Sequence, residues 1–258
     1  MRVATPAYIL RRIRWSETSL ILTMYSLDYG RISGIVKGAL RQPKSGNKFL
    51  GTLELFNLSN FQLLRREGRE LDTITDVNVL SHNFPLRTSP EAFSAAGLFT
   101  DWLLVMVDFG NEPSRPVFFL IEEVFRLLMN DAPVWPVICG AIVKLLFLSG
   151  HGFSTDTCSI CLEEIKDEKK LNWSHLAGGV VCANCSSTGT PIKRGIVSFL
   201  SGANELELEK LARVKLWQGG YIQCYELLKE YAQVHLERRL KLKSENVMKE
   251  ILNAGQPR

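Results

Sequence analysis

Two Cys-x-x-Cys pairs lie in one segment of this 258-residue chain, CSICLEEIKDEKKLNWSHLAGGVVCANC. Twenty residues separate the pairs, which are Cys158 with Cys161 and Cys182 with Cys185. Each such turn can place two thiolates on one side, and two turns supply the tetrahedral set that zinc prefers. Four protein ligands close the coordination sphere, which favours one structural Zn2+ ion over a catalytic one. An iron–sulfur centre or a redox dithiol is the alternative.

The remaining cysteines and histidines fit structural roles better than chemical ones. Cys139 and Cys224 fall in apolar helical patterns and are predicted to lie in the core. His175 lies between the cysteine pairs, but four cysteines already satisfy an ion, so we interpret it as a loop histidine. His151 has the same interpretation, and His235 is predicted to be a packed histidine.

The composition is that of a globular protein, with 46% hydrophobic and 22% charged residues. Arg11, Arg12 and Arg14 interrupt the only candidate for a secretory signal, and no apolar stretch is long enough to span a membrane. A cytoplasmic protein with reduced cysteines is therefore expected.

Positive charge is concentrated in the N-terminal part. Residues 1–80 hold 12 Lys and Arg against 7 Asp and Glu, a balance of +5, whereas the remainder holds 19 against 20. Such a field attracts polyanions such as nucleic acid, although a solvated basic face is the alternative. The basic positions of residues 10–49 are Arg11, Arg12, Arg14, Arg31, Lys37, Arg41, Lys44 and Lys48.

The basic region is predicted to be a small β-barrel. Short β-branched and aromatic runs, separated by turn signals such as Asp28-Tyr29-Gly30, indicate five strands. Five strands in about 80 residues suit a barrel of the oligonucleotide/oligosaccharide-binding (OB) type, with an SH3-like barrel as the alternative. The predicted strands are Pro6–Ile13, Ser19–Ser26, Arg31–Lys37, Leu53–Leu64 and Glu70–Val79.

After residue 82 the periodicity becomes helical. Ser89 followed by Pro90 predicts an N-cap, and helices are expected from there to about Gly110, from Pro116 to about Asn130, and from Val134 to Ser149. Helical pattern resumes from Pro191 through Leu240, with a last helix after Ser244. The fold class is therefore α+β, with the cysteine module inserted in a helical domain. The predicted domains are the barrel at 1–81, helical parts at 82–153 and 191–258, and the module at 154–190.

Catalytic motifs are absent from the sequence. It lacks a phosphate-binding loop, a His-Glu-x-x-His motif, a Gly-x-Ser-x-Gly elbow and a dinucleotide fingerprint. We therefore favour a binding protein over an enzyme.

Several motifs together resemble the RecO family of bacterial recombination mediators. The run LRRIRWSETSLILTMYSLDYGRISGIVKGALRQPKS is similar to the family's N-terminal signature, and LELFNLSNFQLL, NFPLR, HLAGGVVCANC and LERRLKLKS follow at family-like positions. Many relatives have a glycine after the second cysteine, where this chain has Leu162.

The resemblance implies an N-terminal OB barrel, a helical domain and a zinc module that only some members have. It also implies binding of single- and double-stranded DNA, annealing of strands coated by single-stranded-DNA-binding protein (SSB), and loading of RecA together with RecR, without membrane or small-molecule substrate. An RNA-binding or transcription-associated module, or a nucleic-acid-processing enzyme with an unrecognised motif, is the alternative.

We expect barrel cations to neutralise phosphates and exposed aromatics to stack on bases. The aromatic candidates are Trp15, Tyr29 and Phe49, each of which could instead be a core residue. Arg65, Arg66 and Arg69 form a second basic group, and the run from Glu237 to Lys243 is interpreted as a solvated helix face. The predicted DNA-binding residues are Arg12, Arg14, Arg31, Lys37, Arg41, Lys44 and Lys48.

Overall fold

The computed structural model describes residues 1–41, 49, 51–65, 71–108, 112–165, 170–217, 219–237 and 239–254. The chain divides into two compact units. One comprises Met1–Ala96 and Val107–Phe125, and the other comprises Gly97–Met106 and Arg126–Arg258. The two long helices of residues 90–129 each contribute a part to both units. The domain boundaries expected from the sequence remain a prediction.

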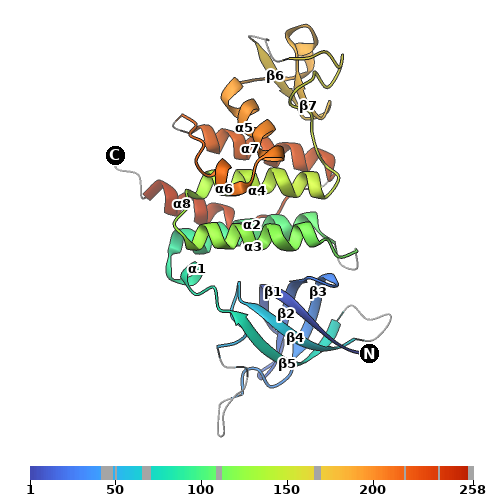
Figure 1. Ribbon diagram of the computed structural model, residues 1–258, viewed down its shortest axis with the longest axis vertical. Helices are drawn as coiled ribbons and strands as arrows, with labels where there is room; N and C mark the ends of the chain where they lie inside the picture. Colours follow the sequence, from blue (N-terminus) through green and yellow to red (C-terminus); the bar gives the residue numbers. More distant parts are fainter. Residues whose placement is uncertain are drawn as a thin grey trace. The chain divides into compact units, whose positions relative to one another are not determined.

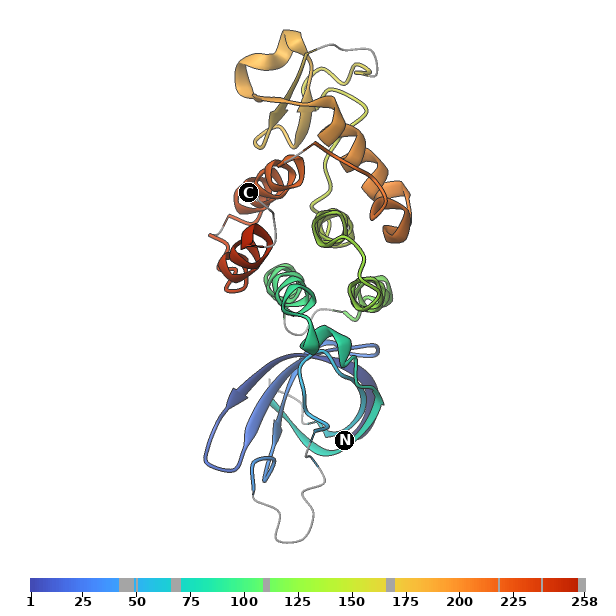
Figure 2. The ribbon, with the colours of Figure 1, turned by 90° about the vertical axis from the view of Figure 1, so that its left-hand side faces the viewer.

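A closed five-stranded barrel forms the N-terminal part, in the strand order β1-β2-β3-β5-β4 (Figure 1). Figure 2 shows the strands curving around the barrel interior. This confirms the OB-type barrel, and Asp28-Tyr29-Gly30 makes the predicted turn between the second and third strands. The strands are β1 Arg2–Arg14, β2 Leu20–Ser26, β3 Gly30–Val36, β4 Leu58–Leu64 and β5 Leu71–Ser81.

Two strand boundaries differ from the prediction by more than two residues. β1 begins at Arg2 rather than Pro6, because residues 2–4 pair with the end of β4. Residues 53–57 are not part of β4, since Phe56 adopts the left-handed region with a φ of 69°. The Phe56 N–H donates to the Ile9 carbonyl at 2.8 Å, and its buried ring packs 5.2 Å from that of Phe125, so tertiary contacts hold this conformation.

The barrel packs apolar side chains both inside and outside. Inward-facing residues such as Ile9, Leu22 and Phe61 are fully buried in its core. On the outer face, Tyr8 and Tyr25 are also buried, because the ring of Tyr8 contacts Phe118 at 5.2 Å and the Tyr25 hydroxyl bonds to the backbone of Ser114. The segment Val107–Phe125 therefore covers part of the outer barrel face within the same unit.

The helical part follows the predicted pattern closely as far as residue 148. The Ser89 Oγ accepts a bond from the Ala92 N–H at 3.2 Å, which confirms the predicted N-cap. The short helix α1 was not predicted, and α2 ends at Met106 rather than near Gly110. These helices are α1 Pro85–Thr88, α2 Pro90–Met106, α3 Arg115–Met129 and α4 Val134–Leu148.

The region after residue 149 departs more from the prediction. Pro191 lies in a strand rather than at the start of a helix, because it pairs with Asn172 in a small three-stranded sheet of order β7-β6-β8. The long helical pattern divides into three helices, of which α7 begins after Gly219 (φ 77°). The elements are β6 Leu171–Ser174, β7 Gly179–Val181, the 3-10 helix η1 Ala183–Thr188, β8 Thr190–Ile192, α5 Arg194–Glu205, α6 Leu208–Leu211, α7 Gly220–His235 and α8 Glu245–Ala254.

The second unit is organised around α4, which contacts α5, α6 and α7. Ten residues of α4 are buried, so it is the core helix of this unit. Cys139 on α4 and Cys224 on α7 are both fully buried, as predicted. The small sheet lies in the chain between α4 and α5, so the cysteine module is an insertion in the helical part.

Candidate metal centre and nucleic-acid interface

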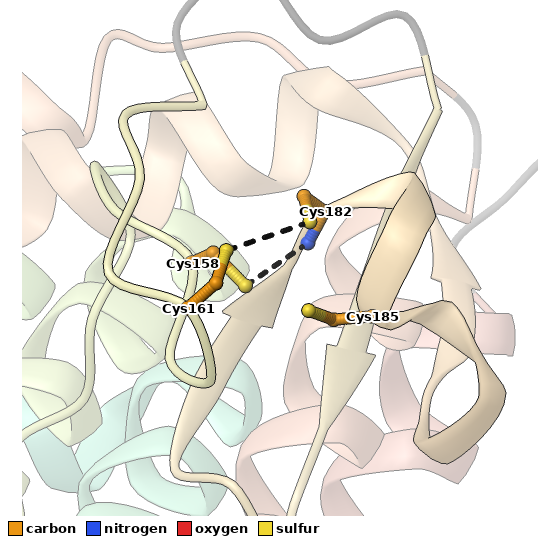
Figure 3. Close-up of side chains that lie close together, drawn as sticks. All are labelled: Cys158, Cys161, Cys182 and Cys185. Atoms are coloured by element: carbon orange, nitrogen blue, oxygen red, sulfur yellow. Dashed lines mark hydrogen bonds between the residues drawn. The ribbon is translucent and has the colours of Figure 1, made fainter.

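The four predicted cysteines converge on one point of the module. Their sulfur atoms all lie within 4.8 Å of one another, and the Sγ atoms of Cys161 and Cys182 are 3.8 Å apart (Figure 3). Cys158 and Cys161 come from a loop, Cys182 follows β7, and Cys185 lies in η1. The structure thus brings together a set of ligands positioned to bind a metal ion.

Backbone hydrogen bonds hold both cysteine turns. The Leu162 N–H donates to the Cys158 carbonyl at 2.9 Å, and the Cys185 N–H donates to the Cys182 carbonyl at 3.1 Å. The Ser159 N–H donates to the Val180 carbonyl at 2.8 Å, which ties the first turn to β7. Leu162 itself has a φ of 65°, in the left-handed region that glycine adopts most easily.

The electrostatics of the cluster favour a bound cation. Burial raises the pKa of Cys158, but backbone N–H groups, including that of Cys182 at 3.4 Å, outweigh it and lower the pKa to about 6. Desolvation and hydrogen bonds with the other three cysteines raise the pKa of Cys185 to about 12. Four thiolates repel one another at this distance, so a multivalent cation is needed to keep all of them deprotonated.

His175 has other partners than a metal. Its Nδ1 accepts a bond from Trp173 Nε1 at 3.1 Å, so its proton lies on Nε2, which contacts Glu230 at 3.1 Å. His235 Nε2 donates to the His175 carbonyl at 2.8 Å, and its ring packs on Tyr231. Both histidines therefore connect the cysteine module to α7, in agreement with the structural roles predicted for them.

The predicted DNA-binding residues differ in their exposure and in their bonding partners. Arg12 forms an ion pair with Glu54, and Arg31 Nη1 donates to the Val107 carbonyl at 2.8 Å. Arg14, Lys37 and Arg41 are exposed. Lys44 and Lys48 lie outside the described residues, as do Arg66 and Arg69 of the second basic group. Arg65 pairs with the buried Asp72 at 3.1 Å.

Only one of the three aromatic candidates is well placed to meet a base. Phe49 is 9% exposed in the barrel core, and Tyr29 is partly buried beneath the Arg65 guanidinium, 4.3 Å from its ring centre. Trp15 is 65% exposed. The sequence could not separate these three, because exposure depends on which face of the barrel each ring occupies.

Exposed cations and apolar side chains meet at one end of the barrel, at a surface that we name the barrel rim. Arg14 pairs with Leu20, which pairs with Val36, so the ends of β1 and β3 flank the start of β2. The Leu40 N–H donates to the Thr18 carbonyl at 3.1 Å, which brings the two adjoining turns together. The barrel rim consists of Arg14, Trp15, Lys37, Leu40 and Arg41.

Family models match both parts of the chain. The description "Recombination protein O N terminal" applies to residues 1–83, and "Recombination protein O C terminal" applies to residues 87–244. The chain belongs to the RecO family. This confirms the resemblance seen in the sequence, and the two matches cover the barrel and most of the helical part with its cysteine module.

Curated relatives agree with this assignment over most of their length. The chain is 29% identical over 239 residues to the DNA repair protein RecO of Desulforamulus reducens, covering 91% of this chain and 90% of that protein. It is 30% identical over 240 residues to the DNA repair protein RecO of Pelotomaculum thermopropionicum, with the same coverage. The protein of the same name from Rhodopirellula baltica is 28% identical over 204 residues, covering 79% and 74% of the two chains.

In the described part of the chain, no helix is both long and apolar enough to cross a membrane.

Proposed function

We propose that this protein is a DNA-binding recombination mediator. It binds single- and double-stranded DNA, anneals complementary strands, and with RecR helps to load RecA on strands coated by SSB. Membership of the RecO family supports this function, as do the names of the curated relatives. It acts in the cytoplasm, on nucleoid DNA, and catalyses no covalent reaction.

One observation carries the proposal: the barrel rim places a largely exposed indole beside exposed cations. Trp15 lies next to Arg14 in the chain, and the turn that follows it is hydrogen-bonded to the turn of Lys37 and Arg41. Cations neutralise phosphates and release counterions, while an exposed aromatic ring stacks on a base of any sequence. Such a surface binds a strand without base preference, as annealing of arbitrary sequences requires.

The proposed contribution of the protein to annealing is electrostatic. A strand whose phosphates are neutralised by the rim repels a complementary strand less, so the two can meet and pair. The lack of sequence-reading contacts is useful here, because the bases themselves supply the specificity. No nucleotide is consumed in such a process.

We propose that the metal is one structural Zn2+ ion, held by Cys158, Cys161, Cys182 and Cys185. Zn–S bonds of about 2.3 Å directed to the corners of a tetrahedron place neighbouring sulfur atoms about 3.8 Å apart. The Cys161–Cys182 separation of 3.8 Å fits this spacing. The ion would hold two turns and the small sheet together and leave no open position for a substrate.

The test is a salt titration of single-strand binding with charge variants. The rim variant carries Arg14→Gln, Lys37→Gln and Arg41→Gln. A control variant carries Lys210→Gln, Arg213→Gln and Lys215→Gln, which removes the same charge from exposed positions of the other unit. Each neutralised phosphate contributes about −0.7 to the slope of log K against log[salt], so three contacts contribute about −2.

The rim variant should lose about this share of the slope, measured by fluorescence anisotropy of a labelled oligonucleotide, with circular dichroism as the folding control. Annealing should decline in parallel. The control variant should keep the wild-type slope. An unchanged slope in a folded rim variant would refute the assignment of the strand to the rim. Equal affinity for RNA without any annealing would instead favour an RNA-binding module.

A further inference from the structure

The segment after α7 is not the helix face that the sequence predicted. α7 ends at His235, and Glu237 adopts a φ of 51°, which breaks the helix. From residue 239 the burial alternates: Arg239, Lys241 and Lys243 are exposed, whereas Leu240 is only 6% exposed. Alternation with a period of two is typical of extended backbone. We name Arg239–Lys243 the basic strap.

Both ends of the basic strap are fixed within the second unit. At the start, the His235 ring donates to the His175 carbonyl at 2.8 Å. At the end, the Ser244 N–H donates to the Asp101 carboxylate at 2.7 Å, and the Glu245 carboxylate accepts from Lys229 Nζ at 2.7 and 2.9 Å. With Leu240 buried between these anchors, the three cations are held on the outer side of the strap.

The strap lines a hollow of about 790 Å³ between α7 and α8. Most acids that line the same hollow are paired: Glu230 contacts the neutral His175 and keeps its charge, but Glu226 and Glu245 bond to lysines. In contrast, Arg239, Lys241 and Lys243 make no ion pair or side-chain hydrogen bond with any described residue. Three cations without a partner therefore stand against one such carboxylate, and the surface is net positive.

We infer that the basic strap is a second binding site for a nucleic-acid strand, which takes the sugar-phosphate backbone. This rests on the proposed function. Residues 239–242 lie in neither helix nor strand, and Lys243 begins the turn before α8. Fully extended backbone rises about 3.3 Å per residue, so the strap's cations span at most about 13 Å. That length corresponds to about four nucleotides at the rise of 3.4 Å per nucleotide in one strand of a duplex.

A strand backbone fits this surface better than an acidic peptide does. The cations alternate along the strap with Leu240, which is buried, and Leu242, which is partly buried, so the side chains that the strap exposes fully are its three cations. Each compact unit of the protein then has its own surface for a strand, the rim on the barrel and the strap on the helical unit. Annealing involves two strands, so a second site gives the second strand a place to bind.

The test uses a strap variant of the full-length protein with Arg239→Gln, Lys241→Gln and Lys243→Gln. The control variant at Lys210, Arg213 and Lys215 is closely matched, because it also removes one arginine and two lysines from exposed positions of the same unit. Oligonucleotide affinity is titrated with salt for wild type, strap, rim and control variants. Annealing rates and zinc content are measured in the same preparations.

Loss of three phosphate contacts should make the slope of log K against log[salt] less negative by about 2. Between about 50 and 200 mM salt, the affinity of the strap variant should then fall by a factor about 16-fold smaller than that of the wild type. Annealing should fall while zinc content stays unchanged. A strap variant whose slope and annealing equal those of the control variant overturns the inference and leaves the proposed function intact. The inference is also overturned, in favour of a peptide site, if a labelled aspartate-rich peptide binds the wild type but not the strap variant while oligonucleotide binding is the same in both.

The two proposals fail in different ways. A wild-type protein that binds no oligonucleotide refutes the proposed function, and the strap inference falls with it. A slope that changes in the strap variant but not in the rim variant refutes the rim assignment alone and supports the strap.

Discussion

Trp15 shows how much a single side chain contributes to the proposed function. Replacing Trp15 by Ala should weaken single-strand binding by about 1–3 kcal/mol, because stacking on a base is lost while the charges of the rim remain. Trp15→Phe should retain most of the affinity. Phe84→Ala is a suitable control, since Phe84 is another aromatic residue of the same unit and is 61% exposed. Equal losses at both positions, measured by anisotropy, would contradict a specific stacking role.

Leu162 occupies a backbone conformation that its side chain disfavours. Its φ of 65° costs about 1–2 kcal/mol for an L-residue other than glycine, and its side chain is 74% exposed, so little packing is lost on removal. Leu162→Gly should therefore stabilise the protein by about 1 kcal/mol after the entropy of glycine is subtracted. The free energy of unfolding measures this in urea.

Leu176→Gly is the matched control for that change. Leu176 is 83% exposed but does not have a positive φ, so glycine there should only add freedom to the unfolded chain and destabilise the protein. If both glycine variants lost stability equally, the strain at Leu162 would not be real.

At the scale of an element, we expect a bound metal ion to stabilise the cysteine module. Replacing Cys158 and Cys161 by Ser should release the ion and lower the free energy of unfolding, by about 4 kcal/mol at a free-metal concentration a thousand times the Kd. Single-strand binding at the rim should persist, because the rim belongs to the other compact unit. Elemental analysis and anisotropy measure both effects.

Cys224→Ala serves as the control for the cysteine pair, because Cys224 lies in the core of α7 and away from the four ligands. It should keep one ion per chain. A zinc-free double variant that stays fully stable but no longer binds DNA would assign the cysteine cluster a direct role in binding.

The stability that the contact between the cysteine module and α7 contributes should depend on pH through His175. Burial lowers the pKa of His175, although Glu230 partly opposes this. The unfolded chain, with an ordinary pKa near 6.5, then binds more protons than the folded chain between the two values. Stability should therefore fall as the pH decreases through 6.5 towards the lower folded pKa, because protonation of Nδ1 breaks the bond from Trp173.

Unfolding in urea at several pH values between about 5 and 7.5 measures this effect. His175→Gln should be less stable at neutral pH and should show a flatter dependence on pH in this window. His151→Gln should retain the wild-type dependence. Identical profiles for wild type and His175→Gln would show that another group is responsible.

At the scale of the whole molecule, the net charge is small but the positive charge is concentrated in particular regions. The net charge is only +4, yet residues 1–80 have a balance of +5, and the basic strap adds a separate group of cations in the second unit. With moderate net charge we expect weak non-specific association, and with local positive fields we expect attraction of a nucleic-acid strand.

Annealing should therefore need no nucleotide and should weaken steeply with salt. Complementary oligonucleotides, bare or coated by SSB, should pair faster in the presence of the protein without ATP, and ATP with Mg2+ should not change the rate. The reason is that neutralised phosphates alone lower the repulsion between strands. A fluorescence-resonance assay of pairing follows the rate. A rate that requires ATP would indicate catalysis and contradict the proposal.

Local patterns in the sequence were sufficient for much of this protein. Short β-branched and aromatic runs between turn signals predicted the barrel, the Ser89 cap predicted the start of α2, and the spacing of the cysteines predicted a cluster positioned to bind a metal ion. Each of these depends on neighbours within a few residues, or on the chelating geometry of one turn. Pattern and spacing determine such features because backbone preference and side-chain periodicity act locally.

Tertiary contacts decided the remaining features. Phe56 leaves the strand because its ring is buried against Phe125, and Pro191 joins a sheet because Asn172 lies beside it. Trp15 is exposed whereas Phe49 is buried, because aromatic residues of one barrel can face the solvent or the core. The run from Glu237 to Lys243 was interpreted as a helix face, but residues 239–243 lie outside any helix, with Leu240 buried and the Ser244 N–H bonded to Asp101. Long-range burial outweighs local propensity at these positions, and one sequence does not reveal which distant residues will meet.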